Sequence, residues 1–141
     1  MTKEDLIWFA GLFDGESCIS IYWAKRGPDS GQWLFKISLG MAHKPTIDKV
    51  HHLFPGSRYQ RKKKGNYRAM WMMEWTTKKA AILLREIYPY LVTKKKEAKV
   101  ALSVVEPRYK RGGMLMTDLE RESYKNASER LKVLKREEFN G

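Results

Sequence analysis

The stretch LIWFAGLFDGES, residues 6–17, places eight uncharged residues before two carboxylates, Asp14 and Glu16, that flank a glycine. Thr2 precedes it as a helix N-cap, with Asp5 as the acid at the third helical position. Apolar residues then recur at helical spacing, at Leu6, Phe9, Ala10 and Phe13. The pattern predicts an amphipathic helix that ends near Asp14.

The sequence after this helix alternates with a period of two, as in half-buried strands. Ile19, Ile21 and Trp23 share one side, the turn sequence KRGPDSG follows, and residues 33–43 alternate again. The second run places Trp33, Phe35, Ile37, Leu39 and Met41 on its buried side. These two strands are expected to form an antiparallel hairpin.

A short helix beginning at Pro45 and ending at Pro55-Gly56 leads to a second hairpin. Its arms are expected at residues 57–63 and 66–75, around Lys64-Gly65. The second arm has Trp71, Met73 and Trp75 on one face and Met70, Met72 and Glu74 on the other. Parity therefore does not decide which face of this arm is buried.

Three helices complete the expected architecture. One follows Thr76-Thr77 and breaks at Pro89, and the next runs from about Lys94 to Pro107. A basic linker at 107–116 precedes a C-terminal helix at 117–141, which opens with a Thr117–Glu120 capping box. The fold class is α+β: an αββαββα core in residues 1–106, with helices on one face of a four-stranded antiparallel sheet, plus the C-terminal helix.

Composition favours a polyanionic partner. The 141 residues carry 28 Lys+Arg against 16 Asp+Glu, a net charge of +12, and the pI is near 9.8. The longest apolar run, residues 6–13, is far shorter than the roughly 20 residues that span a bilayer. No cationic leader precedes it, so we expect an intracellular protein, cytoplasmic, organellar or phage-encoded, that is neither secreted nor membrane-bound.

The cysteine count excludes two kinds of stabilisation. Cys18 is the single cysteine, so neither a disulfide framework nor a CxxC zinc site is present. A lone cysteine beside a strand is expected to lie in the core.

The sheet face away from the helices is expected to be basic. Its candidate nucleic-acid contacts are Tyr22, Arg26, Lys36, Arg58, Gln60, Arg61, Lys62, Lys63, Lys64, Asn66 and Arg68. Residues 57–68 contain no acid, and Tyr59 and Tyr67 are interleaved with the cations. A solvated turn is the alternative, but a basic, amide-bearing sheet can lie in the major groove of duplex DNA.

Two acids at a helix C-terminus oppose the helix dipole, at a cost of about 0.3–1 kcal/mol each. A divalent cation reverses this effect, since Mg²⁺ binds one or two carboxylates, carbonyls and phosphate oxygens. Residues i and i+2 do not share a helix face, so one of Asp14 and Glu16 is expected to bind metal directly. The alternative is that Asp14 is a local cap and Glu16 a surface charge.

A glycine in the middle of this helix costs about 1 kcal/mol relative to alanine. Ala10-Gly11 is explained either by a tight spot in the protein's own core or by the close approach of a second helix. If that helix belongs to a second copy, Ile7, Ala10 and Gly11 lie at the dimer interface, and two Glu16 residues meet at its end.

Three segments together resemble the LAGLIDADG homing endonucleases. FAGLFDGES, residues 9–17, is similar to the signature nonapeptide. ISLGMAHKPTIDKVHHLF at 37–54 is similar to the second strand and the helix after it, and IYPYLVTKKKEAKVAL at 87–102 to the P-Y-L-x-x-K segment. Ser17 replaces the usual final glycine, and Ile47 stands where some members have an arginine.

The resemblance implies a role for each matching residue. Glu16 is the metal-binding acid, the Gly15 backbone carbonyl is an additional ligand, and Asp14 supports them. Lys94 lies near the scissile phosphate, and His43 orders water at the end of the second strand.

A single copy of the signature implies a Mg²⁺-dependent homodimer. Such a dimer hydrolyses phosphodiester bonds in a palindromic or near-palindromic duplex. The alternatives on the same scaffold are a non-cleaving DNA-binding regulator and a group I intron RNA maturase. A general RNA-binding protein is disfavoured, because the chain lacks RNP and GXXG motifs.

Overall fold

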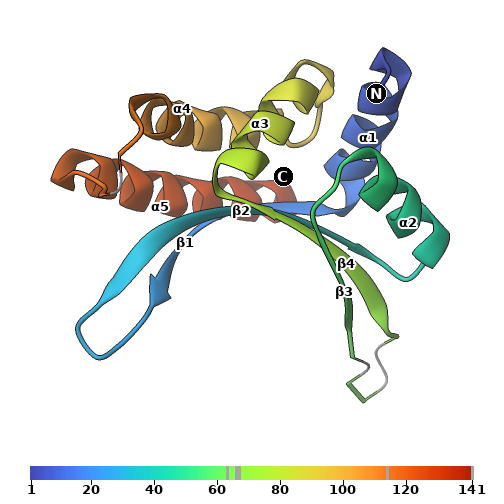
Figure 1. Cartoon of the computed structure of the whole chain (residues 1–141), viewed down its shortest axis with the longest axis horizontal. Coiled ribbons are helices and arrows are strands. Elements are labelled where there is room, and N and C mark those ends of the chain that lie inside the picture. Colours follow the sequence, from blue (N-terminus) through green and yellow to red (C-terminus); the bar gives the residue numbers. More distant parts are fainter. Residues whose placement is uncertain (63, 66–67, 114, 141) are drawn as a thin grey trace.

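The computed structural model describes residues 1–62, 64–65, 68–113 and 115–140. A four-stranded sheet forms an arch, and the helices lie on its convex side (Figure 1). The elements in chain order are α1 (Lys3–Glu16), β1 (Ser17–Lys25), β2 (Gly31–Met41), α2 (Lys44–Leu53), β3 (Ser57–Arg61), β4 (Met70–Thr76), α3 (Thr77–Ile87), the 3₁₀ helix η1 (Tyr88–Tyr90), α4 (Lys95–Arg111) and α5 (Asp118–Asn140). The α+β class and the αββαββα order predicted from the sequence are confirmed.

Helix α1 begins at the predicted cap. The Thr2 hydroxyl accepts a hydrogen bond from the Asp5 backbone N–H, and the Asp5 carboxylate accepts one from the Thr2 N–H. The helix ends at Glu16, two residues later than predicted, where the Ser17 N–H bonds to the Phe13 carbonyl. The chain passes directly into β1, so Glu16 lies at the junction of helix and sheet.

The sheet order is β1-β2-β4-β3, with every neighbouring pair antiparallel. The predicted antiparallel first hairpin is confirmed, with Ser17 opposite Leu39 and Lys25 opposite Gly31. In the second hairpin the strands are shorter than predicted, because β3 ends at Arg61 and β4 begins at Met70.

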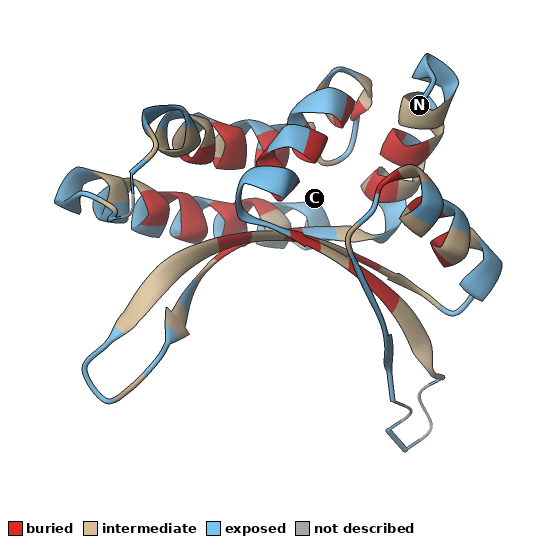
Figure 2. Ribbon diagram, viewed as in Figure 1, coloured by how far each residue is buried: buried red, intermediate tan, exposed pale blue. Residues whose placement is uncertain are grey.

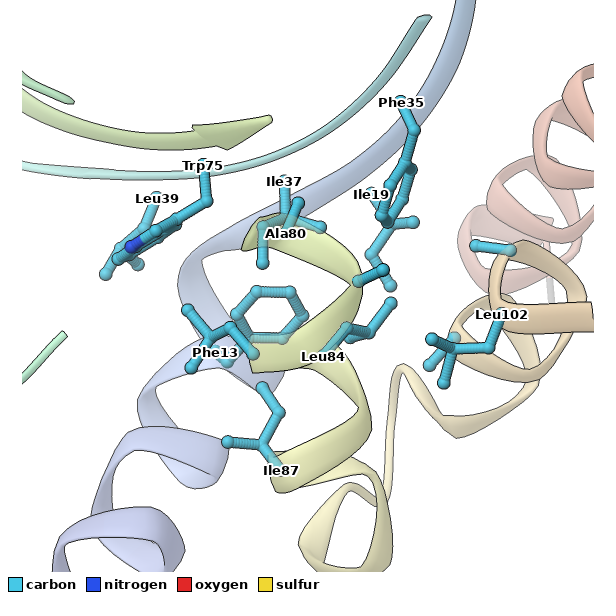
Figure 3. Packing of buried hydrophobic residues seen from close by; sticks show 14 of the residues in the cluster. Phe13, Ile19, Phe35, Ile37, Leu39, Trp75, Ala80, Leu84, Ile87 and Leu102 are labelled. Atoms are coloured by element: carbon cyan, nitrogen blue, oxygen red, sulfur yellow. The ribbon is translucent and has the colours of Figure 1, made fainter. Parts of the chain in front are cut away.

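The hydrophobic core lies between the convex side of the sheet and the helices, where buried residues gather in Figure 2. Phe9 and Phe13 of α1 are fully buried, and Trp75 of β4 is only 2% exposed. The Trp75 indole N–H donates to the Phe54 carbonyl at 3.1 Å, which ties β4 to the end of α2. Figure 3 shows Phe13, Leu84 and Ile87 packed where α1 meets α3 beneath the sheet residues.

The packing decides the parity of β4, which the sequence left open. Trp71, Met73 and Trp75 face the helices and belong to the core or pack against it. Met72 and Glu74 therefore face the concave side, since neighbouring side chains alternate across a strand. Met72 is still buried, because it packs over Gly40 of β2, where an added Cβ would lie 2.4 Å from its sulfur.

Helix α4 corrects one sequence prediction, because it does not end at Pro107 but continues to Arg111. Beyond the proline, Tyr109 packs against the core, and such tertiary packing outweighs the hydrogen bond that a proline omits. The helix stops at Gly112, whose φ is +71°. The segment joining it to α5 is therefore shorter than the predicted linker.

Helix α5 begins at the predicted capping box, in which Thr117 and Glu120 exchange hydrogen bonds. Tyr124, Ala127 and Leu131 are buried against the rest of the core. No helix in the described ranges is both long enough and apolar enough to cross a membrane.

The expectation for Cys18 was wrong, because this residue is exposed. Its position in β1 has the opposite parity to the buried Ile19 and Ile21. Its sulfur lies 3.4 Å from the ammonium group of Lys135 on α5.

Candidate active site and nucleic-acid interface

Asp14 fastens the end of α1 to the segment before α4. One carboxylate oxygen accepts the Val92 N–H at 2.8 Å, and the other accepts the Lys94 N–H at 2.9 Å. These N–H groups lie just before α4, where the positive end of that helix dipole favours an anion. Asp14 therefore does not cap its own helix but holds the segment that leads into α4.

Glu16 and Gly15 remain exposed at the end of α1. The last carbonyls of a helix have no intrahelical partner, so Gly15 can offer its carbonyl oxygen beside the Glu16 carboxylate. Both are hard oxygen donors of the kind that Mg²⁺ prefers, so these residues fit such an ion. Among the described residues of one protomer, no three His, Cys, Asp or Glu side chains form a metal-binding group.

Lys94 is brought to this site through its backbone. It is the N-cap residue of α4 and is half-buried. The hydrogen bond from its N–H to Asp14 spans 80 positions of sequence. The structure thus places Lys94 next to the end of the helix that carries Glu16.

His43 is the N-cap residue of α2 and is exposed. Ser17 pairs with Leu39 and β2 ends at Met41, so His43 follows the strand at the same end of the hairpin as Glu16. Its Nδ1 lies 2.7 Å from the Thr46 hydroxyl, which orients the ring. Ile47, by contrast, is fully buried and cannot serve the site.

A row of polar side chains crosses all four strands of the concave face. The Lys36 ammonium lies 5.2 Å from the centre of the Tyr22 ring and 3.5 Å from the Glu74 carboxylate. On the other side of Glu74, the Tyr59 hydroxyl donates to the same carboxylate at 2.8 Å. Partial burial and this carboxylate raise the pKa of Tyr59 above its ordinary value.

Glu74 is a member of this face that the sequence did not indicate. It is the only acid in the four strands as the structure describes them. A lone acid in a strand otherwise free of acids could have marked Glu74 as a partner for the cations. The sequence did not show which face of β4 it occupies, because the parity of that strand was undecided.

The tip of the second hairpin is the most basic part of the concave side. Arg61, Lys62, Lys64 and Arg68 are exposed there and line a shallow hollow with Met70. Arg26 is exposed near the tip of the first hairpin. The predicted contact Lys63 lies outside the described residues, as do Asn66 and Tyr67.

Arg58 and Gln60 were predicted on the sheet face away from the helices, but they lie on the opposite face. Arg58 pairs with Met73 and Gln60 with Trp71, so both have the parity of the helix-covered side. Arg58 instead forms an ion pair with Asp48 of α2 at 2.7 Å. Ser57, Tyr59 and Arg61 are the β3 residues that face the concave side.

The residues of α1 that were predicted to lie at a dimer interface differ in their exposure. Ile7 is 47% exposed, whereas Ala10 is fully buried in its own core and cannot lie at a subunit seam. A Cβ added to Gly11 or Gly15 meets nothing within 4 Å. The protomer's own packing therefore does not explain either glycine.

Comparison with known proteins establishes the fold. No protein-family model matches the chain, and no curated protein matches its sequence. Among solved structures, homing endonuclease I-CvuI in complex with its target in the presence of Ca aligns at a TM-score of 0.72 and 16% identity, over 93% of this chain and 82% of that one. The archaeal intron-encoded homing endonuclease I-Vdi141I complexed with DNA gives 0.73 and 10% identity, over 93% and 84%.

LAGLIDADG meganuclease I-AabMI bound to uncleaved DNA gives a TM-score of 0.65 at 16% identity, over 86% of this chain but only 44% of its own. The chain therefore has the fold of the LAGLIDADG homing endonucleases, as its nonapeptide predicted. The aligned segment spans most of the I-CvuI and I-Vdi141I chains but less than half of the I-AabMI chain.

Proposed function

We propose that this protein is a Mg²⁺-dependent, site-specific endonuclease that cleaves double-stranded DNA as a homodimer. The observation that carries the proposal is the pair of Asp14 hydrogen bonds, which set Lys94 beside the end of α1. An acid, a carbonyl and a cation thereby gather at one end of the hairpin. This arrangement suits hydrolysis of a phosphodiester bond.

In this proposal Glu16 and the Gly15 carbonyl hold the metal ion. Bound Mg²⁺ supplies stabilisation of the charge that develops on the scissile phosphate and its leaving oxygen. Lys94 adds a positive charge next to the phosphate, and His43 orders water with a ring held by Thr46. Asp14 is a positioning residue, because its carboxylate is occupied by two backbone N–H groups.

The homodimer brings two Glu16 residues to one site. The exposed face of α1, with Ile7, Gly11 and Gly15, offers room for a second helix at short distance. The match to less than half of I-AabMI supports this idea, since one protomer then supplies half of a larger DNA-binding unit. A two-fold axis beside α1 predicts a palindromic or near-palindromic target.

The concave face is the proposed DNA-binding surface. Tyr22 and Lys36 lie at its middle, Arg26 at one tip, and Arg61, Lys62, Lys64 and Arg68 at the other. Cations at the tips bind phosphates and position the duplex, while the polar row lies where base edges are read. Lys63 completes the basic segment in this proposal.

A duplex library with and without Mg²⁺ tests the reaction. We expect the parent protein to cut a short list of related sequences only with the metal. Glu16→Gln should lower the cleavage rate at least about 100-fold while binding is retained. Glu4→Gln, a change at an exposed acid of the same helix, is the matched control and should cut normally.

Binding without cleavage by the parent protein would refute the nuclease and favour a DNA-binding regulator. Preference for structured intron RNA over duplex DNA would favour a maturase instead. Equal cutting by the parent and Glu16→Gln would remove the role given to Glu16.

Sedimentation of Gly11→Leu tests the dimer. The protomer has space for this side chain, so the variant should keep its fold but sediment as a monomer. A dimer of unchanged stability would place the subunit contact elsewhere.

A further inference from the structure

Glu97 is a buried carboxyl group that the proposed reaction does not use. It lies in the first turn of α4 and is 1% exposed. Neither carboxyl oxygen has a hydrogen-bond donor among the described residues. A buried carboxylate without a donor is strongly disfavoured, so this group requires a proton or a cation.

A group able to satisfy Glu97 lies on α5. Glu97 and Glu138 line one cavity of about 270 Å³ together with Val92, Thr93, Lys96, Leu134 and Glu137. Two carboxylates that face one cavity repel each other, whereas an acid and a carboxylate can bind through one shared proton.

The charged groups around the pair come from each neighbouring element. Lys94, the N-cap residue of α4, and Lys96 in its first turn lie on one element, and Lys135 and Glu137 lie on α5. The ammonium of Lys135 is directed to β1, where it donates to the Ile19 carbonyl at 2.8 Å. Asp14 of α1 faces this region through the Val92 and Lys94 N–H groups.

None of Lys94, Lys96 and Lys135 forms an ion pair with Glu97 in the described part of the chain. We propose that Glu97 and Glu138 form one carboxylic acid–carboxylate pair, which fastens the C-terminal turn of α5 to the first turn of α4 and leaves Lys94 free for the DNA backbone. The contact between α5 and α4 does not depend on the proposed function. The statement that Lys94 is left free for the DNA backbone rests on it.

The pair makes this contact dependent on pH. Burial, and then the adjacent Glu138 carboxyl, raise the pKa of Glu97 from 4.5 to about 7. Between these values the folded protein keeps a proton that the unfolded chain has lost, so the free energy of unfolding falls as pH rises. Above about pH 7 Glu97 loses its proton and the turn of α5 loosens.

Ionised Glu97 also competes for Lys94. The two residues are three positions apart at the start of α4, a spacing at which side chains interact. Loss of the proton therefore gives Lys94 a carboxylate partner and draws it from the phosphate.

Hydrogen exchange of α5 in the free protein tests the pair without DNA. In the parent, protection factors of amides 135–138 should fall at least about threefold between about pH 6 and pH 8.5. Glu97→Gln keeps a donor to Glu138 but cannot ionise, so its protection should not change over this range. Glu129→Gln, at an exposed site of the same helix, should behave like the parent.

Thermal unfolding gives a second readout. The midpoint of the parent should fall more steeply between about pH 4.5 and pH 7 than that of Glu97→Gln or Glu138→Gln. Parallel curves for the parent and both variants would overturn the pair. A rise in midpoint with Mg²⁺ alone, absent in Glu97→Gln, would overturn it in favour of a cation site.

Cleavage across pH tests the consequence for Lys94. Rates of the parent and Glu97→Gln should agree near pH 6, and the variant should be roughly threefold faster near pH 8.5. A constant ratio, with the exchange result as expected, would leave the fastening in place and remove the link to Lys94. Absence of cleavage by both proteins would refute the proposed function alone.

Discussion

The two hairpins differ in how firmly their faces are assigned. In β1–β2 the buried residues Ile19, Ile21, Phe35, Ile37 and Leu39 alternate with polar or small ones, and pairing runs from Ser17 to Lys25 without interruption. In β3–β4 the strands are short, and β4 carries large apolar residues on both faces. Its orientation comes from contacts with other elements.

The two hairpins accordingly contribute differently to the structure. The first provides a regular face against the core and starts immediately after Glu16. Both hairpins extend past the core (Figure 2), and the exposed residues near the tip of the second include Arg61, Lys62, Lys64 and Arg68. Trp75, held by Phe54 and Phe9, is the largest of the β4 residues that set which of its side chains face the concave side.

Removal of the Trp75 side chain is expected to have the greatest effect. Trp75→Ala should lower the free energy of unfolding by about 3–5 kcal/mol, because a fully packed indole is lost. Trp23→Ala, at a position 49% exposed in the first hairpin, should cost about 1 kcal/mol, mostly the edge contact with Trp33. Urea denaturation measures both, and equal losses would contradict this role of Trp75.

Two glycines test how tightly each hairpin is packed. Gly56→Ala should destabilise the protein by about 1–3 kcal/mol, since the new Cβ meets the Trp75 indole at 2.6 Å and the Glu74 carbonyl at 2.8 Å. Gly40→Ala meets the flexible thioether of Met72, which can move aside, and should cost less. A greater loss at Gly40 in the same denaturation series would show that the concave side is the more rigid one.

The smallest expected effect comes from alanine substitutions at two arginines of β3, which test which face of this strand contacts DNA. Arg61→Ala should weaken DNA binding and reduce the slope of log K against log salt by about 1, as for one lost phosphate contact. Arg58→Ala, on the helix side, should leave that slope unchanged. Duplex binding measured over a range of salt concentrations distinguishes the two variants. A reduced slope for Arg58→Ala and an unchanged slope for Arg61→Ala would mean that β3 presents its other face to DNA.

Much of the fold could be predicted because its signals are local. The Thr2 and Thr117 capping boxes and the alternation of the first hairpin depend on neighbours within a few residues. Pro107 was misread for the opposite reason: a local rule predicted a helix end, and packing of α4 against the core overrode it. Cys18 was misplaced because its strand neighbours, not its own chemistry, decide its parity.

The candidate site was predicted in part. Asp14, Glu16 and Lys94 were selected from the signature and its related segments, and the structure joins Asp14 to Lys94 directly. Arg58 and Gln60 were assigned to the concave face because charge alone carries no information about strand parity. Glu97 escaped notice, since a glutamate in a first helical turn is ordinarily exposed.

The sequence by itself determined the order of elements, the basic character of the chain and the acids that end α1, because these depend on composition and short-range periodicity. Only the tertiary structure decided which acid is free. Asp14 reaches N–H groups about 80 positions away, and Glu16 does not. It likewise decided the face of β3 and the burial of Ala10 and Glu97, since each depends on contacts between elements distant in the chain.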